Sequence, residues 1–276
     1  KQALTTCMGY GCNCVGISGA RIIDSKRERL IAILTNTLTP CNGRFPAIIK
    51  LISIFFVSFG EKSLLSALIL AMIIVFSLAL TLLLSNLLSK TLLKGEASHY
   101  ILELPPYRKP QPSKILFESV VNRTLFVLGR AVSVAFPAGI VIWILANVSF
   151  GKEVNLLAVF CNLFEPLGKA MGMDGKTLSA FFLGIPANEI VLPIALMSYL
   201  GAGELSGIES TKVISEILYS NGWSNITAVC YIIFSVVHFP CATALITVFK
   251  ETKSIKWTAL SFLIPTALGV VLCCAV

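Results

Sequence analysis

Residues 178–200 read LSAFFLGIPANEIVLPIALMSYL. An apolar run of this length is long enough to cross a bilayer, because about 20 apolar residues suffice. Gly184, Pro186 and Pro193 interrupt it, however. Inside a membrane, broken helix is tolerated only where protein or a water-filled cavity satisfies the freed backbone groups. The stretch therefore predicts a broken membrane segment rather than a simple spanning helix.

The Gly-x-x-x-Asn pattern in this stretch, at residues 184–188 (GIPAN), occurs a second time at residues 9–13 (GYGCN). Each copy is followed later in the chain by Pro-Cys, at Pro40-Cys41 and Pro240-Cys241. Interrupted segments in corresponding positions of the two halves of a membrane protein point to a transport site. We therefore expect an internal repeat that contains two broken or re-entrant gate segments.

The composition places the chain in a membrane. It is 56% hydrophobic and only 13% charged, whereas a soluble domain carries about 25% charged residues. The apolar residues form long blocks, which are 44–60, 64–84, 131–148, 226–249 and 257–276. These blocks predict an all-α, polytopic helical membrane protein. The net charge of +8 does not indicate nucleic-acid binding, because the basic residues lie in short loops between apolar blocks.

The distribution of charge predicts the orientation. The stretches 21–29, 90–123 and 250–256 are basic, and the positive-inside rule assigns them to the cytoplasm. The acidic stretch 201–224 and the balanced stretch 149–177 are then outside.

With this assignment the segment 178–200 both begins and ends outside the cell, so it crosses the membrane an even number of times or not at all. We predict a re-entrant hairpin or two half-helices. An extra crossing at 154–168 is the alternative, although that stretch is short and contains Glu165 and Pro166.

Three regions follow from these patterns. Residues 1–93 form a first gate region with a basic amphipathic loop and two membrane helices. Residues 94–123 form a cytoplasmic linker in which four prolines between 105 and 112 exclude helix. Residues 124–276 form a second gate region. Because the chain starts at Lys1 without Met, we expect it to be a piece of a longer protein.

Two residues of the second break are candidate ligands. Glu189 follows Asn188 in the middle of an apolar segment. An ionisable residue at membrane depth costs roughly 2.5–3.5 kcal/mol on insertion scales, so it is a functional candidate by default. The structural alternative is an ion pair with Lys50 or Arg130.

Cysteines supply the remaining candidates. Cys41 and Cys241 each follow a proline, which frees a carbonyl from the helical pattern, and Cys12 lies inside the first Gly-x-x-x-Asn. Thiol, carbonyl, amide and carboxylate together suit a borderline divalent ion such as Fe²⁺. Asn13 and His238 are weaker candidates. The alternative for each cysteine is packing as a small hydrophobe.

Several chemistries are not indicated. Residues 170–177 (AMGMDGKT) fit a relaxed P-loop pattern, but no strand precedes them as a nucleotide site requires. The nine cysteines show neither a disulfide framework nor structural-zinc spacing. No catalytic arrangement stands out, so we expect neither an enzyme nor a bound cofactor.

The motifs together resemble those of the FeoB ferrous iron transporters. The matching residues are 9–13, Arg21, 27–30 (RERL), Pro40-Cys41 and Arg44 for the first gate, 103–108 (ELPPYR) for the linker, and 184–193 with 238–241 (HFPC) for the second gate. One departure is Cys14-Val15-Gly16, where the family commonly has Val-Pro.

The resemblance implies an Fe²⁺ importer of the bacterial inner membrane. It implies that Cys12, Cys41 and Cys241 line the ion path, and the second gate motif adds Asn188 and Glu189. GTP and Mg²⁺ would bind only in an N-terminal GTP-binding domain of the same polypeptide.

Other implied partners are the lipid bilayer, small cytoplasmic accessory proteins and further copies of the chain, with no nucleic acid. The alternatives are a gate-type carrier of a nucleoside-like or organic solute, and a membrane anchor for a soluble regulatory domain.

Overall fold

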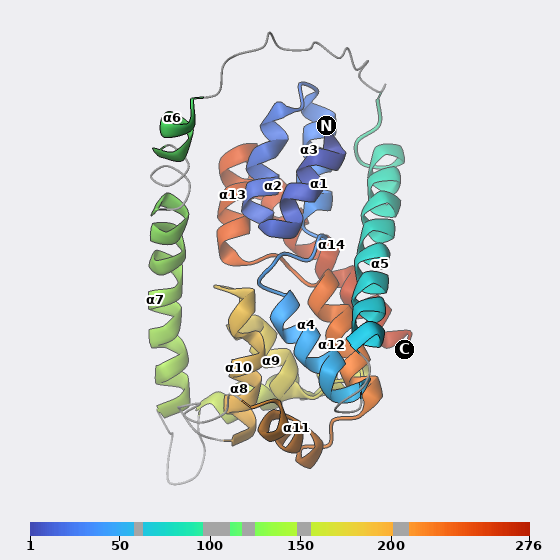
Figure 1. Cartoon of the computed structure of the whole chain (residues 1–276), viewed down its shortest axis with the longest axis vertical. Coiled ribbons are helices and arrows are strands. Elements are labelled where there is room, and N and C mark those ends of the chain that lie inside the picture. Colours follow the sequence, from blue (N-terminus) through green and yellow to red (C-terminus); the bar gives the residue numbers. More distant parts are fainter. Residues whose placement is uncertain (58–62, 96–110, 118–124, 148–155, 201–209) are drawn as a thin grey trace.

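The computed structural model describes residues 1–57, 63–95, 111–117, 125–147, 156–200 and 210–276, and within these ranges it contains helices and no strand. The predicted all-α class is confirmed. In chain order the helices are α1 (Gln2–Gly11), α2 (Asn13–Gly19), η1 (Ala20–Ile22), α3 (Lys26–Asn36), α4 (Phe45–Phe55), α5 (Ser63–Lys90), α6 (Pro112–Phe117), α7 (Phe126–Asn147), α8 (Leu156–Ala170), α9 (Gly175–Leu183), η3 (Asn188–Ile190), α10 (Val191–Leu200), α11 (Thr211–Ser220), α12 (Asn225–Val237), α13 (Ala242–Thr252) and α14 (Ile255–Cys274). The long helices α5 and α7 lie on opposite sides of a central group of shorter helices (Figure 1).

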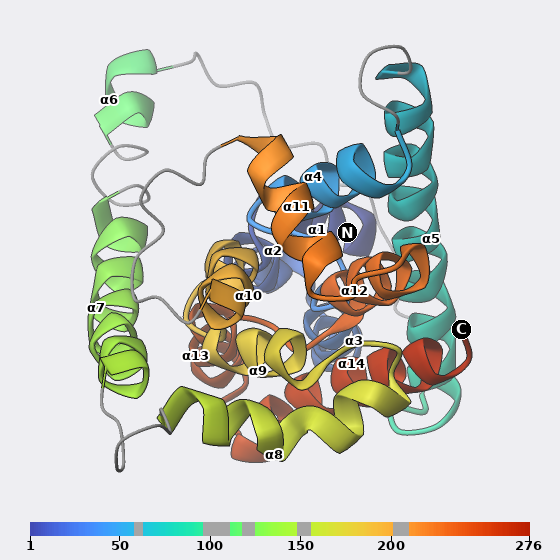
Figure 2. The same ribbon diagram turned by 90° about the horizontal axis from the view of Figure 1, so that it is seen from below.

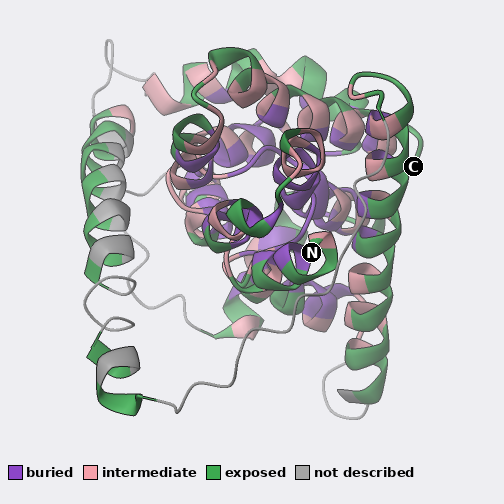
Figure 3. Cartoon of the chain, turned by 90° about the horizontal axis from the view of Figure 1, so that it is seen from above, coloured by how far each residue is buried: buried purple, intermediate pink, exposed green. Residues whose placement is uncertain are grey.

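Three stretches are long and apolar enough to cross a membrane, namely Leu64–Lys90, Asn225–Thr252 and Ile255–Cys274. Buried residues gather in the central helices, whereas α5 presents exposed and half-buried residues along its length (Figure 3). The exposed residues of α5 include Leu68, Met72 and Leu82. A large exposed apolar surface marks contact with a membrane or another protein, so this protein is a helical membrane protein.

Residues 2–19 form a helical hairpin, here called the first hairpin. Its first arm, α1, runs along α5. The Gln2 amide donates to the Ser85 hydroxyl at 3.1 Å, and the Tyr10 hydroxyl lies 2.9 Å from that of Ser77. The chain turns at Cys12, and its return brings Asp24 into an ion pair with Lys1. The first gate copy therefore re-enters the helix bundle instead of crossing it.

Two short helices, α3 and α4, follow the first hairpin. The helix α3 begins after Ser25, whose hydroxyl accepts the Glu28 N–H as an N-cap, and it ends at Asn36. The crossing expected at 44–60 ends outside the described residues, and its described part, α4, has only 11 residues and is about 16 Å long. A hydrocarbon core about 30 Å thick needs more than this helix alone. Residues 37–44 join α3 to α4, and we call them the first Pro-Cys break.

The second half of the chain repeats this plan. Helices α9 and α10 are the arms of a second hairpin, residues 175–200, interrupted at 184–190. The Tyr199 hydroxyl donates to Asp174 Oδ2 at 2.6 Å, so the two ends of the hairpin meet. This agrees with the re-entry predicted for 178–200. Helices α12 and α13 form the second broken span, and residues 238–241 are the second Pro-Cys break.

The two hairpins enter from opposite ends of the bundle. At the first hairpin's end, Arg21 pairs with Glu251 at 2.7 Å, which raises the pKa of Arg21, and the Arg27 guanidinium donates to the Leu93 carbonyl. The three basic stretches therefore share one end, as the positive-inside rule requires. At the other end, the Trp223 indole donates to the Tyr199 hydroxyl at 2.7 Å. The fold is thus an inverted repeat. Most of the proline-rich linker, 94–123, lies outside the described residues.

The helix α8 lies at the end of the bundle that contains α11. It lies across that end (Figures 1 and 2), and it is bent by 113° relative to α9. This placement favours the interpretation in which residues 154–168 do not add a crossing of their own.

Candidate functional site

The two Gly-x-x-x-Asn copies share one backbone conformation. The residue before each asparagine is extended, with φ −156° and ψ 125° at Cys12 and φ −151° and ψ 122° at Ala187. In each copy a helix ends before this residue and a new helical turn begins at the asparagine, Asn13 or Asn188. The similarity of the two sequence motifs therefore extends to their geometry.

Each hairpin break is hydrogen-bonded to the Pro-Cys break of its own half. The Asn42 N–H donates to the Gly11 carbonyl at 3.3 Å, and the Ala242 N–H donates to the Ile185 carbonyl at 2.7 Å. Asn42 and Ala242 occupy equivalent positions, directly after Cys41 and Cys241. These bonds satisfy backbone groups that the interrupted helices leave free.

The side chains at the first Pro-Cys break contact the other half. The Asn188 amide donates to the Cys41 thiol at 3.7 Å. Glu189 lies against Gly43, so closely that a Cβ at Gly43 would stand 2.9 Å from Glu189 Cγ. Three sequence-predicted residues, Cys41, Asn188 and Glu189, are therefore brought together.

The second Pro-Cys break makes the reciprocal contact. Cys12 and Cys241 both pack against the buried cluster that contains Cys14, and α2 packs against α13. Cys14 follows Asn13 as Glu189 follows Asn188, so these two residues hold equivalent positions in the repeat. Sequence analysis did not select Cys14. The signal that could have found it is this equivalence, because it places Cys14 opposite the other half's Pro-Cys.

Arg44, the last residue of the first Pro-Cys break, links this break to the second one. Its side chain is buried, and it donates to the Val236 carbonyl at 2.7 Å, with longer bonds of 3.4 and 3.3 Å to the carbonyls of His238 and Phe239. The Val236 carbonyl belongs to the last turn of α12, and the other two belong to the second Pro-Cys break. Pro240 prevents normal pairing there, and a cation suits the C-terminal end of the helix dipole.

The side chains of the two weaker candidates, Asn13 and His238, make contacts that stabilise the fold. The hydrogen-bond network orients the Asn13 amide so that its nitrogen donates to the Gly9 and Thr39 carbonyls, at 3.2 and 3.0 Å. His238 is buried, its Nδ1 lies 2.9 Å from the Ser235 carbonyl, and its ring packs against Phe181. The helix ends at Val237, so His238 and Cys241 do not share a helix face.

Glu189 differs from the expectation of a buried carboxylate, because its side chain is exposed. It forms no ion pair with the described residues, Lys50 included, and the side chain of Arg130 lies outside the described part. Over the described ranges, no three His, Cys, Asp or Glu side chains are arranged to hold a metal ion. The breaks therefore present separate polar groups and no assembled metal centre.

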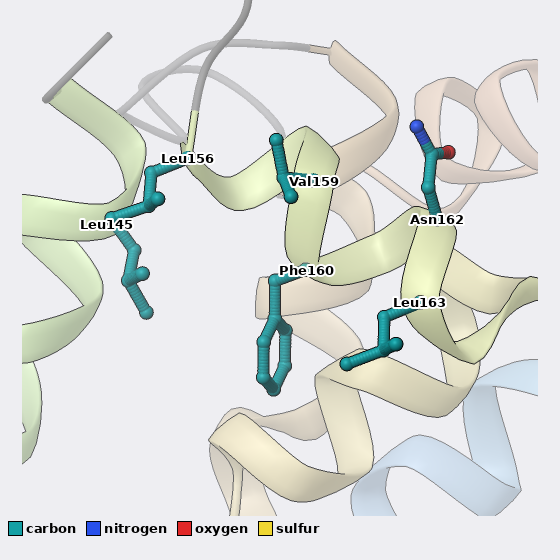
Figure 4. A pocket seen from close by; sticks show the side chains of 6 residues that line it. All are labelled: Leu145, Leu156, Val159, Phe160, Asn162 and Leu163. Atoms are coloured by element: carbon teal, nitrogen blue, oxygen red, sulfur yellow. The ribbon is translucent and has the colours of Figure 1, made fainter. Parts of the chain in front are cut away.

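A pocket of about 550 Å³ lies elsewhere, between α7 and α8 (Figure 4). Its lining is apolar apart from Asn162 and consists of Leu145, Leu156, Val159, Phe160, Asn162 and Leu163. None of these residues belongs to a hairpin break or a Pro-Cys break, so the pocket is separate from the candidate site.

Two family models match the chain. Residues 68–121 match a model described as the C terminus of ferrous iron transport protein B, and residues 128–255 match a gate model described as nucleoside recognition. No solved structure matches.

Among similar proteins, the Fe(2+) transporter FeoB of Staphylococcus aureus (strain MSSA476) is 30% identical over 99% of this chain and 40% of the relative. FeoB of Methanocaldococcus jannaschii is 27% identical over 93% of the chain and 38% of the relative. A protein of Porphyromonas gingivalis, named a fusion of Fe(2+) transport protein A and FeoB, is 24% identical over 98% of the chain and 36% of the relative.

The chain thus spans about two fifths of the length of its relatives. The names of these relatives describe transport, which agrees with the expectation of a permease portion and not an enzyme. Because the similarity covers nearly the whole chain and both gate motifs, the chain belongs to the FeoB family.

Proposed function

We propose that this chain provides the path by which Fe²⁺ crosses the bacterial inner membrane into the cell. The observation that carries the proposal is the reciprocal contact between the two halves. Cys41 accepts a hydrogen bond from Asn188, and Gly43 lies against Glu189. Cys241 packs with Cys12 against the cluster that contains Cys14. The names of the relatives supply the identity of the cargo.

Thiol, amide and carboxylate groups arranged in this way suit a transported ion. A borderline divalent ion such as Fe²⁺ accepts ligands of all three kinds. Conduction also requires that an ion be bound weakly enough, or at enough successive sites, to leave again. Separate groups at two neighbouring breaks meet this requirement better than one closed set of ligands would.

The remaining parts of the system are also proposals. GTP and Mg²⁺ would act in a GTP-binding domain of the same polypeptide, and this chain would carry no resident cofactor. The fusion with Fe(2+) transport protein A in the Porphyromonas gingivalis relative supports a small accessory partner. Self-association is a further proposal.

Ferrous uptake by the complete protein that contains this chain tests the path. We expect Cys41→Ser and Cys241→Ser each to reduce uptake of radiolabelled Fe²⁺, and the double variant to reduce it further. Cys7→Ser is the matched control, because Cys7 is exposed and lies outside both breaks. Undiminished uptake in both single variants and the double variant would remove the cysteines from the path.

The match to a nucleoside-recognition model over residues 128–255 favours a second candidate, a gate-type carrier of a nucleoside-like solute. Such a carrier would need Asn188 and Glu189 for hydrogen bonds and would tolerate the loss of Cys41 and Cys241. Uptake of radiolabelled nucleosides by the same cysteine variants distinguishes the two candidates.

A further inference from the structure

Two membrane spans meet at a very short turn on the basic end of the bundle. The stretches Asn225–Thr252 and Ile255–Cys274 are each long and apolar enough to cross a membrane, and only Lys253 and Ser254 separate them. The helices on either side of the turn, α13 and α14, pack together. A turn this short holds both helix ends at the same depth. It therefore lies at the level of the lipid headgroups, on the side that the positive-inside rule assigns to the cytoplasm.

Three exposed lysines surround this turn, and we call them the turn lysines. Lys250 is in the last turn of α13, Lys253 is in the turn itself, and Lys256 is in the first turn of α14. The neighbouring carboxylate of Glu251 is already engaged, because it accepts hydrogen bonds of 2.7 and 2.8 Å from the Arg21 guanidinium. Across the described ranges, none of the turn lysines pairs with a carboxylate. The turn therefore presents three positive charges to the membrane surface.

Apolar and aromatic side chains adjoin these charges. Ile255 lies between two of the lysines in sequence and is 77% exposed. The Lys256 Nζ lies 5.9 Å from the centroid of the Trp257 ring, and tryptophan is enriched where a membrane meets water. A soluble acidic protein would match the positive charge but would leave Ile255 uncovered within the bilayer. A phospholipid matches both features, because it carries an anionic headgroup and apolar chains.

The backbone of Lys253 adds an independent observation. It has φ 52° and ψ 28°, in the left-handed region, and it is the only non-glycine residue with positive φ in the part of the chain that the structure describes. Glycine is the usual residue at this position after a helix, because a Cβ is unfavourable in that conformation. A lysine at a position whose geometry favours glycine indicates that its side chain has a use.

We propose that the turn lysines and Trp257 form a binding site for an anionic phospholipid, with its acyl chains against Ile255. The lysine ammonium groups donate to the oxygens of the lipid phosphate. A lysine near an anionic membrane surface strengthens binding by about fivefold. The bound lipid would hold the ends of α13 and α14 at the cytoplasmic surface. This inference concerns the surrounding membrane and does not depend on which solute the protein carries.

Lipid binding to the purified complete protein tests the site. The protein in neutral detergent is titrated with dioleoyl phosphatidylglycerol, or with dioleoyl phosphatidylcholine as the neutral lipid, and native mass spectrometry counts the bound lipids. We expect phosphatidylglycerol to bind more tightly than phosphatidylcholine, and this preference to weaken at raised ionic strength, because salt screens exposed charges. The double substitution Lys253→Gln with Lys256→Gln should weaken phosphatidylglycerol binding by roughly 25-fold.

A matched control removes the same charge from the opposite end of the bundle. Lys169 on α8 and Lys212 on α11 are both exposed, and replacing both with glutamine should leave the phosphatidylglycerol affinity nearly unchanged. Lys253→Gly separates the charge from the fold, because glycine suits the left-handed backbone. It should weaken phosphatidylglycerol binding by about fivefold while the thermal midpoint in phosphatidylcholine stays the same or rises.

Four results would overturn the site. The first is equal phosphatidylglycerol affinity in the native protein and the Lys253→Gln, Lys256→Gln variant, and the second is binding of phosphatidylcholine as tight as that of phosphatidylglycerol. The third is displacement of the lipid by inorganic phosphate, which would assign the lysines to a free anion. The fourth is unchanged lipid binding in a variant that loses contact with an acidic soluble domain, which would assign the lysines to a protein partner.

Discussion

Arg44 is predicted to hold the second Pro-Cys break in place, and replacing it with methionine should destabilise the protein. The guanidinium is buried and donates to three carbonyls in and just after the last turn of α12, at 2.7, 3.3 and 3.4 Å. Methionine keeps much of the side-chain length and removes every donor. The carbonyls of Val236, His238 and Phe239 would then lose these donors at a depth where water is scarce.

The magnitude follows from the distances. A hydrogen bond from a charged donor contributes about 1.5–3 kcal/mol, and only the bond to Val236 has good length. We assign about 2 kcal/mol to that bond and about 1 kcal/mol to the two long bonds together. Relief of the buried charge offsets part of this sum. A loss of about 2–3 kcal/mol corresponds to a fall of roughly 4–12 °C in the unfolding midpoint of a protein near this size.

Thermal unfolding in detergent, followed by tryptophan fluorescence, measures the effect. Lys50→Met is the matched control, because Lys50 is an exposed cation on α4, the helix that Arg44 precedes. An exposed substitution of this kind changes stability by about 0.5 kcal/mol or less. If Arg44→Met and Lys50→Met unfold at the same temperature, Arg44 does not hold the break and our account of its role is wrong.

Further substitutions probe the fold. Gly9→Ala should lower the stability by about 1–3 kcal/mol, because a Cβ at Gly9 would overlap the Asn36 side chain. Gly11→Ala is the control, since the space around Gly11 is open and the substitution should change the stability little. Equal thermal midpoints for the two variants would contradict this packing. Tyr199→Phe removes the hydrogen bond to Asp174 and should lower stability by about 1–2 kcal/mol, and retained native stability would show that the second hairpin is closed by other contacts. Arg21→Ala breaks an ion pair whose arginine is 70% exposed and should cost less than about 1 kcal/mol, which a chemical-denaturation comparison at two salt concentrations would check.

The sequence predicted the class of fold and the second broken segment because both depend on local signals. Apolar block length and the helix-breaking residues Gly184 and Pro186 act within a few residues of themselves. The helix α3 was not predicted, for a related reason. Residues 26–36 carry charge at their start and look like a loop, yet they form α3, whose capped first turn begins at the basic end of the bundle.

The sequence singled out Cys41 and Asn188 as separate candidates, and it did not predict that they meet. Their contact depends on how the two halves of the chain pack, which no local pattern specifies. For the same reason, the sequence did not reveal that Cys241 packs against the cluster that contains Cys14 or that Arg44 caps α12. The exposure of Glu189 was missed because apolar neighbours in sequence do not determine which side of a hairpin faces a neighbouring break.

Protection of thiols by the cargo tests the central claim most directly. In the complete protein under anaerobic conditions, the rate of maleimide labelling is measured at each cysteine with and without Fe²⁺. Our account predicts that Fe²⁺ slows labelling at Cys41 and Cys241 and leaves the exposed Cys7 and Cys274 unaffected. Equal labelling rates at Cys41 and Cys241, with and without Fe²⁺, would contradict an ion path between the two halves.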